Sequence, residues 1–204
     1  MTVLTRGFRR GRSRERSDGR LPPGQYDVGH GFPVLSAGPT PRTPLARWDL
    51  TVHDQTGELR RWSWEEFRAL PREALSVDIH CVTTWSKFGT WFAGVSVDTL
   101  LAAARPTAEA RFVMATSKTG YTTNLPLEHI TGGKAWIVWE YDGKPLPVEH
   151  GGPVRLLVPH LYVWKSAKWL TRLTLLQRDQ PGFWEQNGYH DRGDPWQEQR
   201  YWND

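Results

Sequence analysis

The amino-acid sequence predicts a single α+β domain in which mixed β-sheets dominate and the helices are short. Three observations favour this fold class. The 204 residues suffice for one domain with a core of its own and are few for two. The 15 prolines and 19 glycines interrupt the chain too often for long helices. Between those breaks, short segments with alternating apolar residues recur, which is the pattern of β-strands.

The first 30 residues are expected to form a flexible, arginine-rich tail and linker, followed by one domain over residues 31–204. Residues 1–20 contain seven arginines and two acidic residues, so this tail accounts for the whole net charge of +4. Such a segment has too little apolar surface to order itself. Arg9-Arg10 resembles the start of a twin-arginine signal, but no apolar segment follows it.

The cysteine count and the hydropathy pattern indicate the compartment. A single cysteine, Cys81, excludes an intramolecular disulfide framework and a CxxC metal site made by this chain alone. No stretch approaches the roughly 18 apolar residues that span a bilayer. We therefore expect no membrane span and a cytoplasmic protein.

The first expected element is a hairpin. Trp48, Leu50 and Val52 alternate with polar residues and predict a strand over residues 47–53. A return strand is expected over residues 59–62, after a turn that contains a glycine.

Two short helices are expected next. Ser63 and Glu66 have the S-x-x-E spacing of a capping box, which opens a helix that Pro71 ends. Ser96 is expected to cap a second helix over residues 97–104.

The remaining elements are expected to be strands. They are predicted for residues 77–81, 111–116, 121–124, 135–141, 154–158 and 170–176. Asp142-Gly143 is the strongest short hairpin signal in the chain. Residues 182–204 are aromatic and acidic, and we expect them to wrap around the body as an irregular segment.

The lone cysteine is the candidate for the chemical centre. It ends the predicted strand that contains Val77 and Ile79, and it precedes a polar loop with Thr83 and Trp85. The strand would therefore deliver a single sulfur to a polar, aromatic-lined loop. A buried structural thiol is the alternative interpretation, because free cysteine is among the most buried residue types.

A second segment is rich in groups that bind anions. The dinucleotide, P-loop, HExxH and GxSxG signatures are missing from the chain. Instead, two glycines follow His150, and Arg155, Ser166 and Lys168 come shortly afterwards. Glycines let backbone N–H groups approach a ligand, and the side chains can donate charge-assisted hydrogen bonds to an anion such as phosphate. A surface cluster beside a strand is the alternative interpretation.

These segments together resemble a known family. The run WEYDGKPLPVEHGGPVRLLVP over residues 139–159, followed by Lys168-Trp169-Leu170, closely resembles the molybdenum-cofactor domain of the sulfite oxidase family. The compact bacterial members made of that domain alone are especially similar. Cys81 and the segment WFAGV over residues 91–95 fall where the family has its metal-binding cysteine and the segment that follows it. The resemblance covers residues 32–176.

The resemblance implies a cofactor of molybdenum and molybdopterin, without an attached nucleotide and without haem. Cys81 would be the protein ligand of the metal. The contacts to the pterin and its phosphate would come from Thr116, His150, Arg155, Ser166, Ala167 and Lys168. Residues 32–36 resemble the N-terminal stretch with which the family contacts the cofactor.

The same resemblance suggests which groups surround the substrate. Trp85, Lys87, His80 and Tyr162 are the candidates for shaping the pocket, with Lys87 as the group that steers an anion. Adjacent residues of a strand face opposite ways, so His80 is the candidate most prone to point away from the cysteine.

The implied activity is oxygen-atom or electron transfer on a small S- or N-oxide or a sulfite-like substrate. A soft thiolate suits molybdenum, and the cofactor carries the difficult step. The chain contains no second cofactor motif, so a separate electron-transfer partner is expected, and we expect no role for nucleic acid. The arginine-rich setting that sulfite oxidation uses is missing around Cys81, which disfavours sulfite itself.

Two functions of other classes stay open. A non-catalytic module could hold an anion or a cofactor with the same basic cluster. A nucleic-acid-associated protein could act through the arginine tail, which predicts binding that weakens steeply with salt. No stacking platform of the kind that single-strand binders use accompanies the tail.

Overall fold

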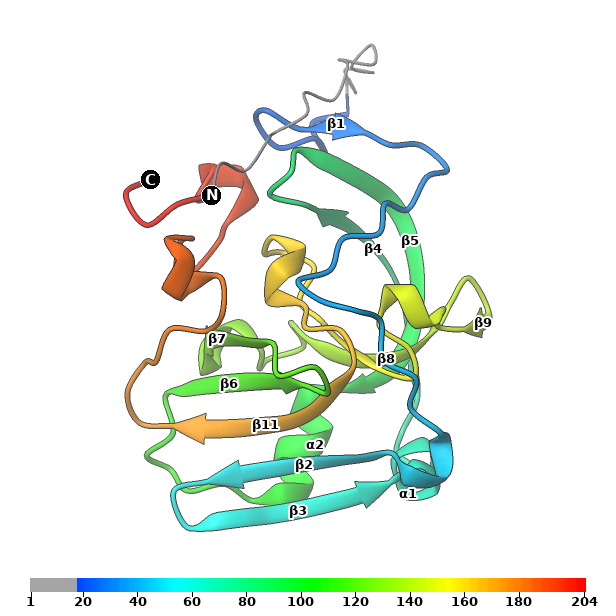
Figure 1. Ribbon diagram of the computed structural model, residues 1–204, viewed down its shortest axis with the longest axis vertical. Helices are drawn as coiled ribbons and strands as arrows, with labels where there is room; N and C mark the ends of the chain where they lie inside the picture. The colour runs from blue at the N-terminus through cyan, green and yellow to red at the C-terminus, as the bar shows by residue number, and fades with distance from the viewer. Residues whose placement is uncertain (1–17) are drawn as a thin grey trace.

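The computed structural model describes residues 18–204, which form two β-sheets with short helices around them (Figure 1). The α+β prediction is confirmed. The expected flexible tail falls largely on residues 1–17, which lie outside the described residues. No helix of residues 18–204 is long and apolar enough to cross a membrane.

Strand β5 is the centre of the six-stranded sheet. This sheet contains β1 (Tyr26–Asp27), β4 (Glu73–His80), β5 (Trp85–Ser96), β8 (Trp136–Tyr141), β9 (Lys144–Pro145) and β10 (Arg155–Leu157). Strand β4 runs antiparallel along one side of β5, while β1 and β8 pair with opposite ends of its other side. Strand β5 begins four residues after Cys81 and ends at Ser96, the cap of the next helix.

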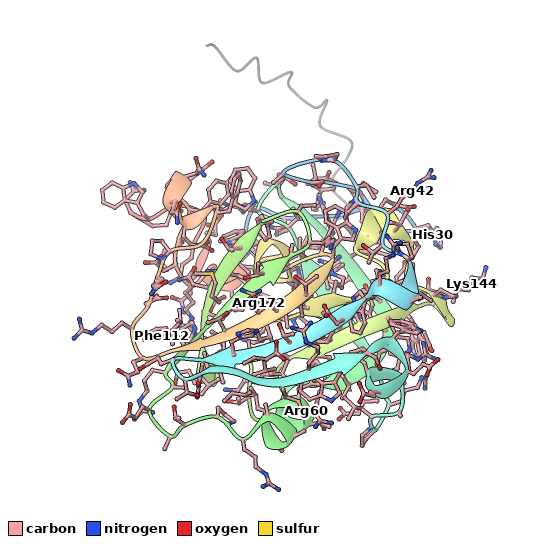
Figure 2. The ribbon with its side chains drawn as sticks, turned by 60° about the horizontal axis from the view of Figure 1, so that its bottom comes forward. His30, Arg42, Arg60, Phe112, Lys144 and Arg172 are labelled. Carbon is pink, nitrogen blue, oxygen red and sulfur yellow. The ribbon has the colours of Figure 1, made fainter. Side chains whose placement is uncertain are left out.

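The five-stranded sheet has the order β3-β2-β11-β6-β7. Its members are β2 (Asp49–Asp54), β3 (Gly57–Ser63), β6 (Phe112–Ser117), β7 (Thr122–Pro126) and β11 (Leu170–Leu176). All neighbours are antiparallel except β11 and β2, which are parallel. Figure 2 looks onto the outer face of this sheet, where Arg172 of β11 is exposed.

Both predicted helices are present. The capping box of Ser63 and Glu66 opens α1 (Trp64–Arg68), and Ser96 caps α2 (Val97–Ala104). The other helical turns are of the 3-10 type: η1 (Leu45–Arg47), η2 (Leu127–His129), η3 (Val148–His150), η4 (Val163–Lys165), η5 (Glu185–Asn187) and η6 (Pro195–Gln197). The last two lie in the C-terminal segment, whose irregular course is confirmed.

The structure differs from the expected linker over residues 18–30. Strand β1 pairs with β5, Gln25 is buried, and the Arg20 guanidinium forms an ion pair with Asp78. These residues therefore belong to the domain. Their sequence contains prolines and glycines and few apolar residues. Contacts with β4 and β5, which are distant in sequence, therefore attach them to the six-stranded sheet.

Two apolar clusters lie on opposite faces of the six-stranded sheet. The larger one joins α2 and the inner face of the five-stranded sheet to residues of β8 such as Ile137. The smaller one contains Ile79, Cys81, Trp85 and Val138. Because Ile137 and Val138 are neighbours, β8 is buried on both faces, and Cys81 lies on the face turned away from the main core.

We expect Gly94→Ala to destabilise the protein strongly. A Cβ atom at Gly94 of β5 would lie 2.6 Å from the Cα of Val138 on the neighbouring strand, where only backbone could give way. Overpacking of this kind costs about 1–3 kcal/mol or more. Thermal unfolding of the metal-free protein measures the effect.

Gly38→Ala is the matched control, because nothing lies within 4 Å of its added Cβ atom and its backbone is unstrained. Equal melting temperatures for the two variants would contradict the close approach of β5 and β8.

Candidate functional site

Cys81 is the first residue after β4 and begins a tight turn. Its N–H donates to the carbonyl of Trp85 at 2.8 Å, and its own carbonyl accepts from the N–H of Thr84 at 2.9 Å. Thr84 has a φ of +76°, the left-handed conformation that lets the chain reverse here. The prediction of a strand that delivers the sulfur to a loop is confirmed.

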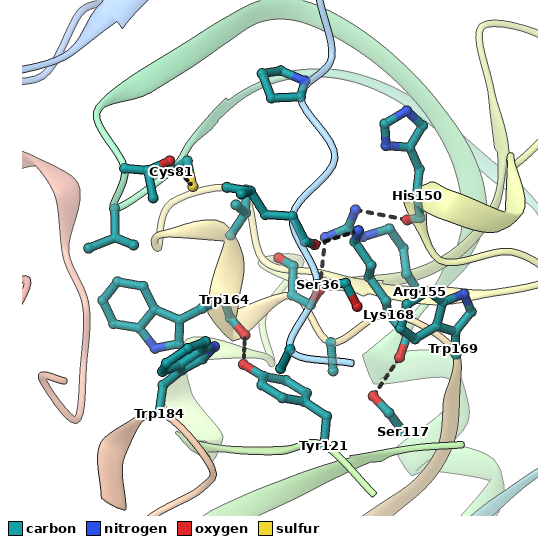
Figure 3. A pocket seen from close by; sticks show the side chains of 18 of the residues that line it. Ser36, Cys81, Ser117, Tyr121, His150, Arg155, Trp164, Lys168, Trp169 and Trp184 are labelled. Atoms are coloured by element: carbon teal, nitrogen blue, oxygen red, sulfur yellow. Dashed lines mark hydrogen bonds between the residues drawn. The ribbon is translucent and has the colours of Figure 1, made fainter. Parts of the chain in front are cut away.

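The turn opens into a cavity of about 340 Å³. Its walls come from residues 32–38, the Cys81 turn, the β6–β7 hairpin, residues 150–155 and residues 163–169. Trp184 and Tyr189 of the C-terminal segment complete it. Figure 3 shows Cys81 at one side of this cavity, and His150, Arg155 and Lys168 at the other.

The thiol itself is almost fully enclosed. Cys81 is 4% exposed, and burial raises the pKa of its thiol. The hydroxyl of Thr83, 3.1 Å from the Sγ atom, acts in the opposite direction because it favours the thiolate. Without a metal, Cys81 therefore carries its proton at neutral pH.

Arg155 is a buried cation with an unusual set of partners. Its guanidinium is 4% exposed and donates to the carbonyls of His150 at 3.0 Å and Ser166 at 2.8 Å. No carboxylate within residues 18–204 forms an ion pair with it. Burial lowers its pKa to about 10, so it stays charged at neutral pH.

Lys168 is the second cation of the cavity. Its ammonium donates to the carbonyls of Leu35 at 2.8 Å and Glu149 at 2.7 Å. Burial, and then the nearby charge of Arg155, lower the pKa of Lys168 to about 8. None of the cavity-lining residues is an aspartate or a glutamate, so the two cations create a site that attracts an anion.

The glycines and His150 complete the cationic side. A Cβ atom at Gly151, where φ is +113°, would lie 3.1 Å from the Lys168 backbone. The His150 ring stacks on Phe32 at 3.8 Å, and its buried Nδ1 atom has no partner among the described residues. Burial lowers the pKa of His150 to about 4, so the ring is neutral. A neutral imidazole with an unpaired nitrogen is suited to a polar ligand.

The side near Cys81 has aromatic walls that the C-terminal segment holds in place. Trp164 lines the cavity, and its indole N–H donates to Oε1 of Glu185 at 3.0 Å. Glu185 also forms an ion pair of 2.6 Å with Lys165, and both side chains are completely buried. A Cβ atom at Gly193 would lie 2.6 Å from the Trp164 ring, so the backbone of the C-terminal segment packs directly against this ring.

Most of the predicted site residues come together in this cavity. Its lining includes Cys81, Trp85, His150, Arg155, Ser166, Ala167 and Lys168, together with Phe32 and Ser36 from the predicted N-terminal stretch. These residues reach the cavity from separate segments of the chain, 32–36, 81–85, 150–155 and 166–168.

Four predicted residues do not line the cavity. The Lys87 ammonium donates to the carbonyls of Gly29 and His30, which cover it. His80 points the other way from Cys81, with its Nδ1 atom 2.8 Å from a serine hydroxyl. Thr116 does not line the cavity, but the next residue of β6, Ser117, does. Tyr162 is fully buried behind Trp164.

Several lining residues were not among the predicted site residues. They are Val82, Ser117, Thr119, Tyr121, Val163, Trp164, Trp184 and Tyr189. Thr83 and Trp169 also line the cavity, and the sequence had placed them only in the loop after Cys81 and in the segment that carries the family resemblance. The high tryptophan count was the available signal, and it does not separate core rings from cavity walls. The aromatic character of residues 182–204 was a second signal, because that segment supplies part of the wall.

Comparisons with known proteins agree with this arrangement. A family model described as "Oxidoreductase molybdopterin binding domain" matches residues 37–184. The uncharacterized oxidoreductase YuiH of Bacillus subtilis (strain 168) is 42% identical over 184 residues, which cover 90% of this chain and 92% of that protein.

Two further relatives carry more specific names. The putative protein-methionine-sulfoxide reductase subunit YedZ1 of Azospira oryzae is 27% identical and covers 71% of this chain and 55% of its own length. The protein-methionine-sulfoxide reductase catalytic subunit MsrP of Pseudomonas syringae pv. tomato is 25% identical and covers 79% and 52%. The chain thus spans about half the length of these two relatives.

A solved structure shows the same fold. The sulfane dehydrogenase SoxCD from Paracoccus pantotrophus matches with a TM-score of 0.63 at 17% identity, over 80% of this chain and 46% of that chain. The predicted sulfite oxidase-type molybdopterin-binding fold is therefore confirmed.

The two cations predict a pH dependence for anion binding. In the metal-free protein, sulfate should bind in the cavity more weakly as the pH rises through about 8. The pKa of Lys168 is lowered to about 8, so its charge is present below that pH and is lost above it, whereas Arg155 stays charged. Isothermal titration calorimetry on either side of pH 8 measures the change.

A Lys168→Met variant is the control and should show no step near pH 8. Sulfate affinity that stays constant across this pH in the wild type would contradict an anion site at Lys168.

Proposed function

Because the chain belongs to the oxidoreductase molybdopterin-binding domain family, we propose that it is a molybdenum enzyme whose metal is bound by Cys81. Membership of the family establishes the oxidoreductase class and implies the molybdenum-pterin cofactor. The observation that carries the proposal is one cavity with a thiol at one side and, at the other, buried Arg155 and half-buried Lys168, with no aspartate or glutamate in its lining.

The residues present fit this cofactor. A buried guanidinium that has only carbonyl partners suits a phosphate, and Lys168 adds a second charge beside it. The unpaired Nδ1 atom of His150 suits a polar ring system. The Cys81 sulfur is the soft ligand that molybdenum prefers, and metal binding removes its proton despite the raised pKa.

We propose the cofactor form without a nucleotide, and no haem. Arg155 and Lys168 are the two cationic side chains among the lining residues, which matches one phosphate better than a diphosphate with a nucleoside. The bound group supplies two-electron redox chemistry with transfer of an oxygen atom. The protein supplies orientation and a water-excluding wall, in which Trp164 and Trp184 take part.

For the substrate we propose a small, neutral S- or N-oxide in preference to a sulfite-like anion. The walls near Cys81 are aromatic, while both lining cations lie at the side of the cavity opposite Cys81 (Figure 3). Lys87, the expected anion-steering group, is bound to backbone carbonyls. The names of the two sulfoxide reductase relatives support the same class.

The electrons are proposed to come from a separate partner protein, because no second redox group is implied by the described residues. We also propose a cytoplasmic location. A reducing compartment keeps the lone thiol available for the metal, and cell fractionation tests this point.

Protein expressed in a host that makes the cofactor should contain molybdenum and pterin in equal amounts. Arg155→Ala and Lys168→Ala should each lower that occupancy, because losing a charge-assisted contact to phosphate costs about 1.5–3 kcal/mol. Elemental analysis for molybdenum, together with fluorescence of the oxidised pterin, measures both components.

Arg172→Ala, on the exposed face of β11, is the control and should keep full occupancy. Wild-type protein without molybdenum would refute the proposed function. Full occupancy in both cavity variants would show that the phosphate lies elsewhere.

A further inference from the structure

The sulfur of Cys81 has one polar side-chain partner among the described residues, the hydroxyl of Thr83. The hydroxyl lies 3.1 Å from the Sγ atom, and Thr83 lines the same cavity. We propose that Thr83 is a positioning residue that aims the Cys81 sulfur and sets the reduction potential of the metal bound to it. This inference rests on the proposed function of Cys81 as the metal ligand.

Hydrogen bonds hold the backbone of the turn that carries Thr83. Both ends of the turn are fixed, by the hydrogen bonds between Cys81 and Trp85 and between Thr84 and Cys81. The side-chain amide of buried Gln25 donates to the Cys81 carbonyl at 3.2 Å, so this carbonyl accepts two hydrogen bonds. Thr84, directly after Thr83, has the left-handed backbone that lets the chain reverse here.

A distant residue holds the middle of the turn. The guanidinium of Arg200 donates to the carbonyl of Val82 at 2.5 Å and lies over the Tyr162 ring at 5.2 Å. Val82 is the residue between the cysteine and the threonine. The C-terminal segment therefore holds the peptide that precedes Thr83. The contact between the Thr83 hydroxyl and the Cys81 sulfur thus depends on a residue far along the chain.

The choice of residue at position 83 suits this role. A β-branched side chain has few accessible χ1 rotamers, so its hydroxyl keeps a constant direction. Cys81, which carries the partner sulfur, is 4% exposed, whereas Thr83 is exposed and lines the cavity, so the sulfur is the shielded member of the pair. Hydrogen bonds to the sulfur of a metal-bound cysteine, together with its surroundings, tune the potential of the metal.

The sign of the effect follows from charge. A donor beside the thiolate withdraws electron density from the sulfur, which stabilises the electron-rich, reduced state of the metal and raises its potential. Removing the hydroxyl should therefore shift the potential to more negative values. The electron that changes the oxidation state of the metal is exchanged with the proposed separate electron-transfer partner.

Thr83→Val removes the hydroxyl and keeps the shape, while Thr83→Ser keeps the hydroxyl. In a redox titration of the holoenzyme followed by electron paramagnetic resonance, Thr83→Val should lower the equilibrium constant for one-electron reduction roughly tenfold, which is about 59 mV. Thr83→Ser should stay near the wild type. Equal potentials in the valine variant and the wild type would overturn the proposal.

A second measurement needs no metal. The chain contains one cysteine, so its S–H stretching band in a Raman spectrum belongs to Cys81. In metal-free protein the band should shift in Thr83→Val and not in Thr83→Ser. An unshifted band in the valine variant would refute the hydrogen bond. If the band shifts but the protein binds no molybdenum in a host that makes the cofactor, the hydrogen bond stands and only the proposed function is refuted.

Discussion

The burial of the Arg155 guanidinium without a carboxylate is the constraint on which the cavity depends. Removing a charge from water is costly, and carbonyl oxygens offset only part of that cost. Here three carbonyls, of His150, Leu156 and Ser166, accept hydrogen bonds from the guanidinium, and Lys168 adds a second charge nearby. An anionic ligand would complete the site, so the local structure is arranged for a ligand more than for the stability of the empty protein.

Lys165 shows the contrast within the same stretch of chain. Its ammonium is fully buried, but it has a carboxylate partner in Glu185 and two more acceptors on Asn124. In such a pair the two buried charges offset each other, and breaking it would leave an unpaired buried charge. Lys165 therefore fixes the C-terminal segment that supports Trp164, while Arg155 and Lys168 stay available for a ligand.

Local signals in the sequence predicted both helices and most of the strands, but they predicted no strand over β5 (Trp85–Ser96), the centre of the six-stranded sheet. The capping box at Ser63 and the hairpin turn at Asp142-Gly143 were predicted correctly because each is made by neighbouring residues. The gathering of Cys81 with Arg155 followed from the family resemblance, since no periodicity shows which distant loops meet. Lys87 was misjudged as a cavity residue because its partners lie in a stretch that reads as a linker.

The most direct test of the central claim is X-ray absorption at the molybdenum K-edge of the purified holoenzyme and of Cys81→Ser. The wild type should show three sulfur ligands, two from the pterin and one from Cys81, and the serine variant should show two. The same number of sulfur ligands in both proteins would contradict the assignment of Cys81 as the metal ligand.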